Sequence, residues 1–455
     1  MSQLIDARSA SRIAASSSIL VFPGDPGWDE ARRAWNLAVD QRPAAVALPE
    51  SVEDVVAVVD HARTVGLCVA VQGTGHGATH EPLDGALLVN MARMTGVEID
   101  PEARVARVAA GTIWIDVVDA AIEHGLTALH GSSQDVGVVG YSLGGGIGWL
   151  ARKHGLSSSS VLSAQVVTAA GEVVRADPET NADLFWALRG GGGSFGIVTE
   201  VEIALYPVTE AYAGWLIWPM DRAGEVLGAW AEWTRAAPEE VTSIGRMLQI
   251  PPIPEMPELL RGRQVVVVEA AYLGDEASGR ELLRPLTDLG PEIDTFAVVP
   301  ARALTELHQD PPAPVPGMGD GWMLDTFDAT AASAIVAAAA MDGTAPLISV
   351  EVRHLEGALG RPDPSAGVLS HLDAAYVVYA VGVPTGPDAA SAIGERLGQL
   401  RAASEPWLSR TGYANFVERE VEPSTFFPEG VYGRLSEIRS QLDPGGLFRA
   451  RHAIV

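Results

Sequence analysis

The sequence predicts a mixed α+β fold in two domains, and three observations carry that prediction. The 455 residues are 47% hydrophobic and 20% charged, which is enough apolar material for a large core and more than one domain. Up to about residue 207, short strands and helices alternate with glycine-rich loops. Beyond that point, longer apolar strands alternate with helices, a pattern typical of an α+β domain.

The composition excludes several classes of partner. The 58 acidic and 31 basic side chains give a net charge of -27, so neither nucleic acid nor an anionic membrane surface is expected to bind. Cys68 is the only cysteine, which excludes an internal disulfide and a thiolate metal cluster. The first 18 residues are polar and lack the apolar core of a secretory signal, and no apolar run reaches the roughly 18 residues of a membrane span. We therefore expect a cytoplasmic protein with no metal and no membrane span; the oligomeric state stays open.

The first glycine-rich loop follows a strand. Apolar residues at helical spacing predict a helix over residues 52–62, with Gly66 as its stop. The run CVAVQ at residues 68–72 predicts a strand that opens into GTGHGATH, a loop with three glycines in five positions. A hairpin over residues 97–109 and a helix over residues 114–124 follow.

The second glycine-rich stretch, residues 131–148, holds seven glycines in eighteen positions, too many for the interior of a helix or strand. Two such loops indicate that backbone N–H groups come close to a bulky anion, and a diphosphate suits such an arrangement. Neither loop is followed by the lysine of a Walker motif, which excludes a kinase-like site. The residues alone therefore indicate a dinucleotide held outside a Rossmann fold.

Two short motifs point elsewhere. The segment GGGSFG at residues 191–196 satisfies the dinucleotide pattern G-x-G-x-x-G, but a predicted helix precedes it and a strand follows, so we interpret it as a tight turn. The segment GYSLG at residues 140–144 would make Ser142 the nucleophile of a serine hydrolase, which is the remote alternative. The glycines at 144–146 argue against it, because each would weaken the helix that must follow by roughly 1 kcal/mol.

The rest of the chain is predicted as follows. A hairpin turns at residues 170–171, a helix spans 182–189 and a strand closes the first half. In the second half we expect helices near residues 223–236, 276–289 and 389–403, and one over 431–442 that could return to the first domain. Two proline-rich segments, residues 251–260 and 310–321, are expected to be loops that shape a pocket.

Five stretches together resemble one family. They are residues 44–77 (from AAVALPE to GTGHG), residues 136–156 (VGVVGYSLGGGIGWLARKHGL), residues 182–207 (ADLFWALRGGGGSFGIVTEVEIALYP) and the C-terminal YANF and LDPGGLFRARHAI. In this order and spacing they resemble the FAD-linked oxidases of the berberine bridge enzyme type, within the vanillyl-alcohol oxidase superfamily. Residues 210–340 match only in general texture.

The resemblance implies a PCMH-type FAD-binding domain made of two α/β subdomains, and a substrate domain with a large antiparallel sheet covered by helices. It places the FAD-binding domain at residues 1–207, the substrate domain at 208–405 and a C-terminal segment at 406–455 that returns to the FAD-binding domain. The flavin ring is expected between the two domains.

The resemblance also implies how FAD is held. His76 takes the place of the histidine that bonds to the flavin 8α-methyl group in this family. Many members add a cysteine to the flavin C6, but Ser133 stands at that position, so we expect a single link. The remaining residues expected to bind the cofactor are Gln72, Gly73, Thr74, Gly75, Gly77, Ala78, Ser132, Val136, Gly137, Gly140, Ser142, Gly145, Gly148, Val198, Tyr413 and Asn415.

The candidate catalytic residues are Tyr413 and Glu351. Tyr413 resembles the tyrosine that several members place over the flavin. As a base it needs either a nearby cation, Arg353 or Lys153, or the flavin dipole to lower its pKa. Glu351 lies on a predicted strand with Arg353 on the same face and His354 on the other, and its alternative role is an ion pair with Arg353. We expect Arg353, His130 and Tyr141 to contact the substrate, although a structural role for His130 is equally open.

The expected function is oxidation of a small organic substrate by hydride transfer to flavin N5, with electrons passed to O2. Val136 supports the use of oxygen, since a valine there resembles the oxygen-using members. An alcohol, a sugar, an amine and a natural-product intermediate all remain open as substrates. A flavin-dependent oxygenase or cyclase of secondary metabolism is the alternative that keeps the cofactor.

Overall fold

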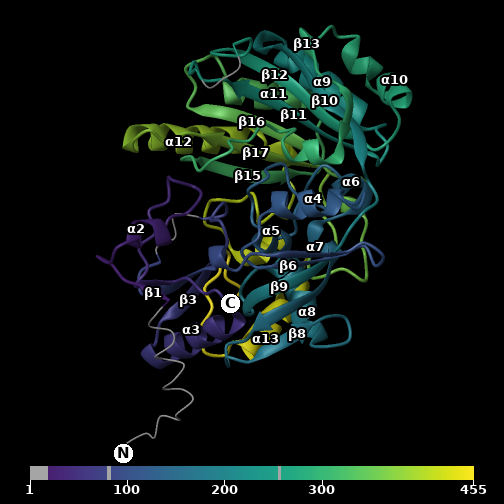
Figure 1. The fold of residues 1–455 in the computed structure, drawn as a ribbon. Coiled ribbons are helices and arrows are strands. Elements are labelled where there is room, and N and C mark those ends of the chain that lie inside the picture. The colour runs from purple at the N-terminus through teal and green to yellow at the C-terminus, as the bar shows by residue number, and fades with distance from the viewer. Residues whose placement is uncertain (1–18, 79–82, 255–257) are drawn as a thin grey trace, which may run out of the picture.

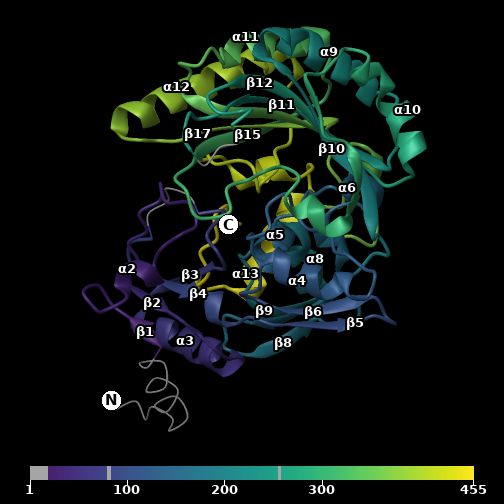
Figure 2. The ribbon, with the colours of Figure 1, turned by 45° about the horizontal axis from the view of Figure 1, so that its top comes forward.

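The computed structural model describes residues 19–78, 83–254 and 258–455, so the predicted polar leader at residues 1–18 lies outside the described residues. The described chain contains three sheets (Figures 1 and 2). The predicted α+β fold, with a large antiparallel sheet covered by helices, is confirmed.

The first small sheet has four strands in the order β1-β2-β4-β3, and two of its three strand pairings are parallel. Helix α3 packs on it, with Ser51 and Asp54 forming a reciprocal N-terminal cap and Gly66 ending the helix at a positive φ of 75°. The bounds of these elements are β1 Leu20–Val21, β2 Ala45–Ala47, α3 Val52–Val65, β3 Cys68–Gln72 and β4 Ala86–Asn90.

The second small sheet has five antiparallel strands in the order β5-β6-β9-β7-β8. The two predicted hairpins form its edges. The strands are β5 Val97–Asp100, β6 Val105–Ala109, β7 Val161–Val167, β8 Val173–Ala176 and β9 Ile197–Ala204. The helices beside it are α4 Trp114–Ile122, α5 Val138–Leu143, α6 Ala151–His154, α7 Ser157–Ser160 and α8 Ala182–Gly191.

The large sheet is antiparallel throughout, in the order β13-β10-β12-β11-β16-β17-β15, with β14 also paired to β10. Helices cover its outer face, and the opposite face looks toward the two small sheets (Figure 2). The strands are β10 Glu210–Pro219, β11 Val241–Gln249, β12 Gln264–Tyr272, β13 Ile293–Asp294, β14 Ala297–Pro300, β15 Met318–Leu324, β16 Leu347–His354 and β17 Tyr376–Gly382. The helices are α9 Ala223–Thr234, α10 Glu276–Thr287, α11 Ala329–Ala339 and α12 Pro387–Ala403.

Alternation along the strands sets the chemistry of the inner face. In β16, Val350 and Val352 pack under the helices, so Glu351 and Arg353 lie on the inner face. His354 lies on the helix side, stacked on Tyr376. The predicted placement of Glu351 and Arg353 opposite His354 is therefore confirmed.

The C-terminal segment packs against the first small sheet. Leu447 O accepts from Val69 N at 2.7 Å, and Val69 O accepts from Arg449 N at 2.8 Å, which ties residues 447–449 to β3. Helix α13 (Val431–Leu442), with the predicted bounds, packs on α8, and its Leu435 shares a core with Val69. In Figure 1 this yellow segment lies among the purple and blue elements.

One expectation about local structure is wrong. The stretch 131–148 was expected to contain no helix, but residues Val138–Leu143 form α5, with Gly137 before it and Gly144 after it. A single glycine lies inside this helix, and the other glycines of the stretch lie outside it. The helix is therefore destabilised by one glycine rather than by seven. Among the described residues, no helix combines the length and apolar character needed to cross a bilayer.

Candidate functional site: a cavity between the glycine loops and the large sheet

A cavity of about 1640 Å³ lies between the small sheets and the inner face of the large sheet. This volume exceeds that of an ordinary small-molecule pocket, so it has room for a dinucleotide together with a substrate. Both glycine-rich stretches, the turn at residues 190–193, the inner face of the large sheet and residues 449–454 line it. The proline-rich segments line it too, through residues 251, 253, 310–312 and 315–317, as the sequence predicted. The second segment is shorter than predicted, because residues 318–321 belong to strand β15.

The loop after β3 packs closely on its own support. Gly75 has a φ of +83°, and a Cβ there would lie 2.8 Å from the Cα of Ala34 and 2.9 Å from the N of Trp35. A side chain at Gly75 therefore has no space. The backbone N–H groups of Gly75, His76 and Gly77 make no hydrogen bond to any described residue, which leaves three donors at the cavity wall.

The opposite wall is backbone without side chains. A Cβ added to Gly140, Gly192 or Gly193 would meet no atom within 4 Å, so each of these glycines faces open cavity. Side chains there would occupy the space in which a bulky ligand lies. The free donors on one loop and the bare backbone of the others fit a diphosphate-containing cofactor.

Most residues predicted to bind the cofactor line the cavity. They are Gln72, Gly73, Thr74, Gly75, His76, Gly77, Ala78, Ser132, Val136, Gly137, Gly140, Val198, Tyr413 and Asn415. Ser142, Gly145 and Gly148 do not line it, and the structure gives each a packing role instead. A Cβ on Gly148 would lie 1.8 Å from the His130 carbonyl oxygen, and one on Gly145 would lie 3.0 Å from Leu369 and Tyr413.

The hydrolase alternative finds no support in the geometry. Ser142 is fully buried inside α5, and its Oγ lies 3.0 Å from the Oγ of Ser157. A nucleophile must be exposed and bonded to a general base. His130 is corrected as well: it is fully buried, does not line the cavity, and its Nδ1–H donates to the Gly131 carbonyl at 2.6 Å.

His76 is held by two residues that the sequence did not single out. Its Nε2 lies 3.0 Å from Oδ1 of Asp135, and its ring stacks on Trp35 with centroids 3.9 Å apart. Trp35 Nε1–H and Ser133 Oγ–H also donate to Asp135, at 2.5 and 2.9 Å. Burial raises the pKa of Asp135, but these hydrogen bonds, led by His76, outweigh burial and lower it. Asp135 is therefore an anion that only accepts, and Nε2 carries a proton.

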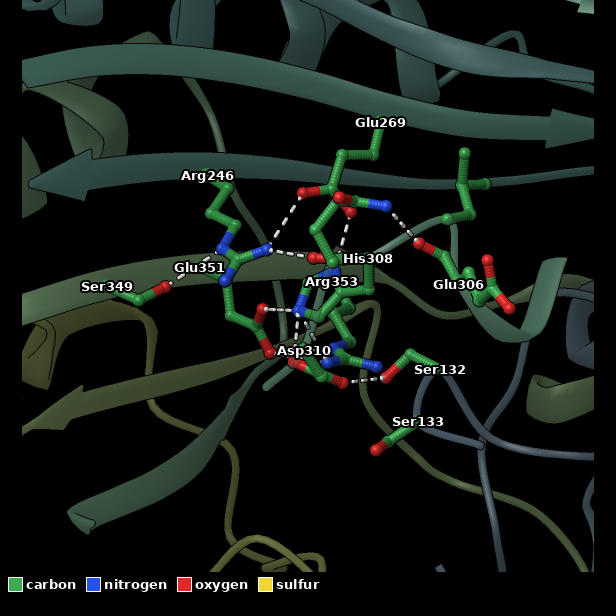
Figure 3. A network of polar contacts seen from close by, with 12 residues as sticks. Ser132, Ser133, Arg246, Glu269, Glu306, His308, Asp310, Ser349, Glu351 and Arg353 are labelled. Atoms are coloured by element: carbon green, nitrogen blue, oxygen red, sulfur yellow. Dashed lines mark hydrogen bonds and ion pairs between the residues drawn. The ribbon is translucent and has the colours of Figure 1, made fainter. Parts of the chain in front are cut away.

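A charged network covers the inner face of the large sheet (Figure 3). His308 lies between two carboxylates, with Nδ1 2.6 Å from Glu269 and Nε2 2.9 Å from Glu351. Arg353 donates to Glu351 through Nε and Nη2, both at 2.8 Å, and Arg246 donates to Glu269 at 3.1 Å. We call these five residues, with Asp310, the ionic cluster; it contains three cations and three anions.

Asp310 connects the ionic cluster to the glycine-rich stretch. Ser132 Oγ–H donates to its Oδ2 at 3.2 Å, and its Oδ1 lies 3.9 Å from His308 Nε2. Its side chain is 28% exposed, whereas Glu269 is fully buried. Asp310 is therefore the carboxylate of the ionic cluster that is most exposed to the cavity.

The ionic cluster fixes the protonation of His308 and Glu351. Burial and Arg246 lower the pKa of His308, but Glu269, Asp310 and Glu351 outweigh them and raise it to about 9. Burial raises the pKa of Glu351, but Arg353 and His308 outweigh burial and hold it well below its usual range. Glu351 therefore stays ionised and does not act as a proton acceptor. Of its two predicted roles, the structure shows the ion pair with Arg353.

This arrangement predicts a pH dependence of stability. The pKa of folded His308, about 9, exceeds its ordinary 6.5, so its contribution is complete below pH 6.5 and is lost as pH rises toward 9. We expect the melting temperature to fall over this interval, and to fall less in His308→Gln, whose folded form has no imidazolium to lose. Differential scanning fluorimetry from pH 6.5 to 9 measures this. Equal slopes in the two proteins would contradict the prediction.

Tyr413 lies in the cavity, but its pKa moves in the direction opposite to the one expected. Its oxygen accepts from Gly146 N–H at 2.8 Å and from the Asn415 amide at 3.2 Å. Burial raises its pKa, and these bonds and Arg353 lower it by less. The expected help from Lys153 is absent, since that ammonium pairs with Glu240 at 2.5 Å and does not line the cavity. Tyr413 therefore stays protonated and offers its O–H to the cavity.

Comparisons with known proteins agree with this geometry. Residues 43–177 match the family described as FAD binding domain. The chain is 36% identical to (R)-6-hydroxynicotine oxidase of Paenarthrobacter nicotinovorans over 46% of the chain and 47% of that protein. The aligned part thus spans about half the length of this and the other first curated relatives.

Solved structures match over almost the whole chain. The crystal structure of 6-hydroxy-D-nicotine oxidase from Arthrobacter nicotinovorans has a TM-score of 0.84 at 26% identity, covering 96% of this chain and 97% of that one. Glucooligosaccharide oxidase from Acremonium strictum, whose structure carries a 6-S-cysteinyl, 8α-N1-histidyl FAD, has a TM-score of 0.84 at 22% identity and 98% coverage of both chains. The predicted resemblance is thereby confirmed: residues 43–177 form an FAD binding domain, and the whole chain has the fold of the berberine bridge enzyme-like FAD-linked oxidases.

Proposed function

We propose that this protein is an FAD-dependent oxidase of a small organic substrate, with FAD held in the cavity and attached through His76. The observation that carries the proposal is the single cavity in which the two glycine-rich loops, His76 and the inner face of the large sheet meet. When bound, FAD supplies the hydride acceptor and the route of electrons to O2.

Residues at one end of the cavity bind the cofactor, and residues at the other end orient the substrate. The N–H groups of Gly75, His76 and Gly77 bind the diphosphate, and the bare backbone at Gly140 and residues 192–193 leaves room for it. Tyr413 orients the substrate by donating a hydrogen bond from its hydroxyl group, because its oxygen already accepts two hydrogen bonds. Glu351 acts through Arg353, whose guanidinium it holds at the cavity wall.

The position of the one cysteine supports a single covalent link between the protein and the flavin. Cys68 is the only cysteine of the chain, and it is exposed at the start of β3 and does not line the cavity. Ser133, at the position where relatives carry a cysteine, donates to Asp135 instead. We propose that His76 alone bonds to the flavin, and that residues 1–207, 208–405 and 406–455 divide the chain as the sequence predicts.

The test of the link is His76→Ala. We expect the wild-type protein to be yellow and to keep its colour in the pellet after acid precipitation. His76→Ala should bind FAD but release the pigment to the acid supernatant. Absorbance near the flavin bands of pellet and supernatant measures both. His124→Ala, which removes an exposed histidine outside the cavity, is the control and should keep the pigment in the pellet.

The test of the reaction class is peroxide formation. We expect one hydrogen peroxide for each turnover of a substrate drawn from panels of secondary amines, alcohols, sugars and aromatic natural products. A product that incorporates oxygen, or a cyclised product without peroxide in equal amount, would replace the oxidase by the oxygenase or cyclase. A colourless protein that takes up no FAD would overturn the proposed function altogether.

A further inference from the structure

Asp135 lies where it controls which nitrogen of His76 is free. The carboxylate accepts from Nε2–H at 3.0 Å, while Nδ1 makes no hydrogen bond to a described residue. A neutral histidine that donates through one ring nitrogen carries its lone pair on the other. The contact therefore fixes the tautomer of His76 in which Nδ1 is the nucleophilic atom.

The arrangement around the pair is rigid. Trp35 covers one face of the imidazole at 3.9 Å with an interplanar angle of 21°, and the same indole donates to Asp135 at 2.5 Å. The backbone N–H of Trp35 donates to the carbonyl of Thr74, two residues before His76, at 3.0 Å. The side chain of Asp135 is only 20% exposed, so water competes weakly for it. Trp35 and Asp135 thus hold the face and the edge of the His76 ring, together with the backbone of the loop that carries it.

We propose that Asp135 is a positioning residue for covalent flavin attachment: it holds the proton on Nε2 of His76 and presents Nδ1 to the 8α-methyl carbon of FAD. This inference rests on the proposed link at His76 and adds the residue that makes the link form. Ser133 and Trp35 complete the site by keeping the carboxylate oriented.

The chemistry of the step balances as follows. The Nδ1 lone pair forms the new N–C bond, and a methyl C–H bond breaks. The proton of that bond leaves to solvent, and its electron pair stays with the flavin until dioxygen takes it, with two protons, to give hydrogen peroxide. The imidazole becomes cationic with its proton still on Nε2, and the anionic Asp135 stabilises that charge, as a carboxylate does beside the histidine of a catalytic triad.

The experiment uses the full chain produced in a host limited for riboflavin, and FAD is then added. Covalent flavin per polypeptide is followed by intact mass over time, and the equilibrium binding of FAD is measured separately. At saturating FAD, Asp135→Asn is expected to attach flavin more slowly by on the order of tenfold to hundredfold, by analogy with the loss of the hydrogen-bond partner of a metal-binding histidine. FAD binding itself should be little changed.

Asp119→Asn is the matched control, since it makes the same change of side chain in an exposed ion pair with Arg302 outside the cavity. It should attach flavin at nearly the wild-type rate. Attachment in Asp135→Asn at the wild-type rate would overturn the role of Asp135. So would slower attachment explained entirely by weaker FAD binding, because that marks a merely structural role.

If Asp135→Asn is unstable, Asp135→Glu decides. The longer carboxylate should restore part of the attachment rate, and no recovery in a stable Asp135→Glu protein would count against the proposal. Wild-type protein that binds FAD but never attaches it would instead contradict the link at His76. Failure of the proposed function and failure of this inference are therefore distinguishable.

Discussion

Glu351→Ala is expected to destabilise the protein by about 3–5 kcal/mol, the cost of breaking a buried ion pair from one side. Glu351 accepts from both His308 and Arg353, and its side chain is only 3% exposed. Its removal leaves two buried cations facing each other, with Arg246 close by. Denaturant unfolding followed by tryptophan fluorescence measures the loss.

The control for this prediction is an ion pair of similar length at the surface. Asp119 accepts from Arg302 at 2.6 Å, but the two side chains are 51% and 42% exposed. Asp119→Asn should change the free energy of unfolding by about 0–1 kcal/mol, because water screens the pair. Similar losses in the two variants would contradict the distinction between the ionic cluster and the surface. Glu351→Ala should also lower turnover, since Arg353 loses its anchor at the cavity wall.

Gly148→Ala is expected to destabilise the fold by about 3 kcal/mol, at the upper end of the usual cost of overpacking. Its Cβ would lie 1.8 Å from the carbonyl oxygen of His130, a backbone atom that cannot swing aside. This result would show that the glycine serves packing rather than contact with the cofactor. Thermal unfolding measures it.

Gly140→Ala is the matched comparison, because both substitutions add one methyl group to a glycine-rich stretch. A Cβ at Gly140 meets no atom within 4 Å and extends into the cavity. Stability should be unchanged or slightly higher, since alanine favours the helix α5. In the His76→Ala background, where flavin is exchangeable, the affinity for FAD should fall. The opposite pattern, a destabilised Gly140→Ala and a stable Gly148→Ala, would contradict both assignments.

Local patterns predicted the elements of the fold well. The helix over residues 431–442 has the predicted bounds, and the strand 68–72 opens into the glycine loop as expected. Period-two alternation placed Glu351 and Arg353 together on one face of β16. These features depend on residues close in sequence, so a pattern can reveal them.

The partners of the site could not be predicted in the same way. Trp35 and Asp135 meet across 100 residues of sequence, and His76 and Asp135 across 59. Glycine count alone also misled for Ser142, Gly145 and Gly148, because a glycine needed for close packing has the same sequence signal as one that faces a ligand. One missed residue did leave a signal: Glu269 is the single charge inside the apolar run of β12, and a buried charge requires partners.

The path of the C-terminal segment has a consequence for biogenesis. Residues 449–454 complete the cavity wall, and hydrogen bonds join residues 447 and 449 to β3, immediately before the loop that carries His76. A ribosome-bound chain lacking these residues therefore presents both glycine loops without their final wall. We therefore expect the cofactor to bind only after this segment has left the ribosome, and a truncation that removes residues 447–455 to lower the amount of FAD that the protein retains.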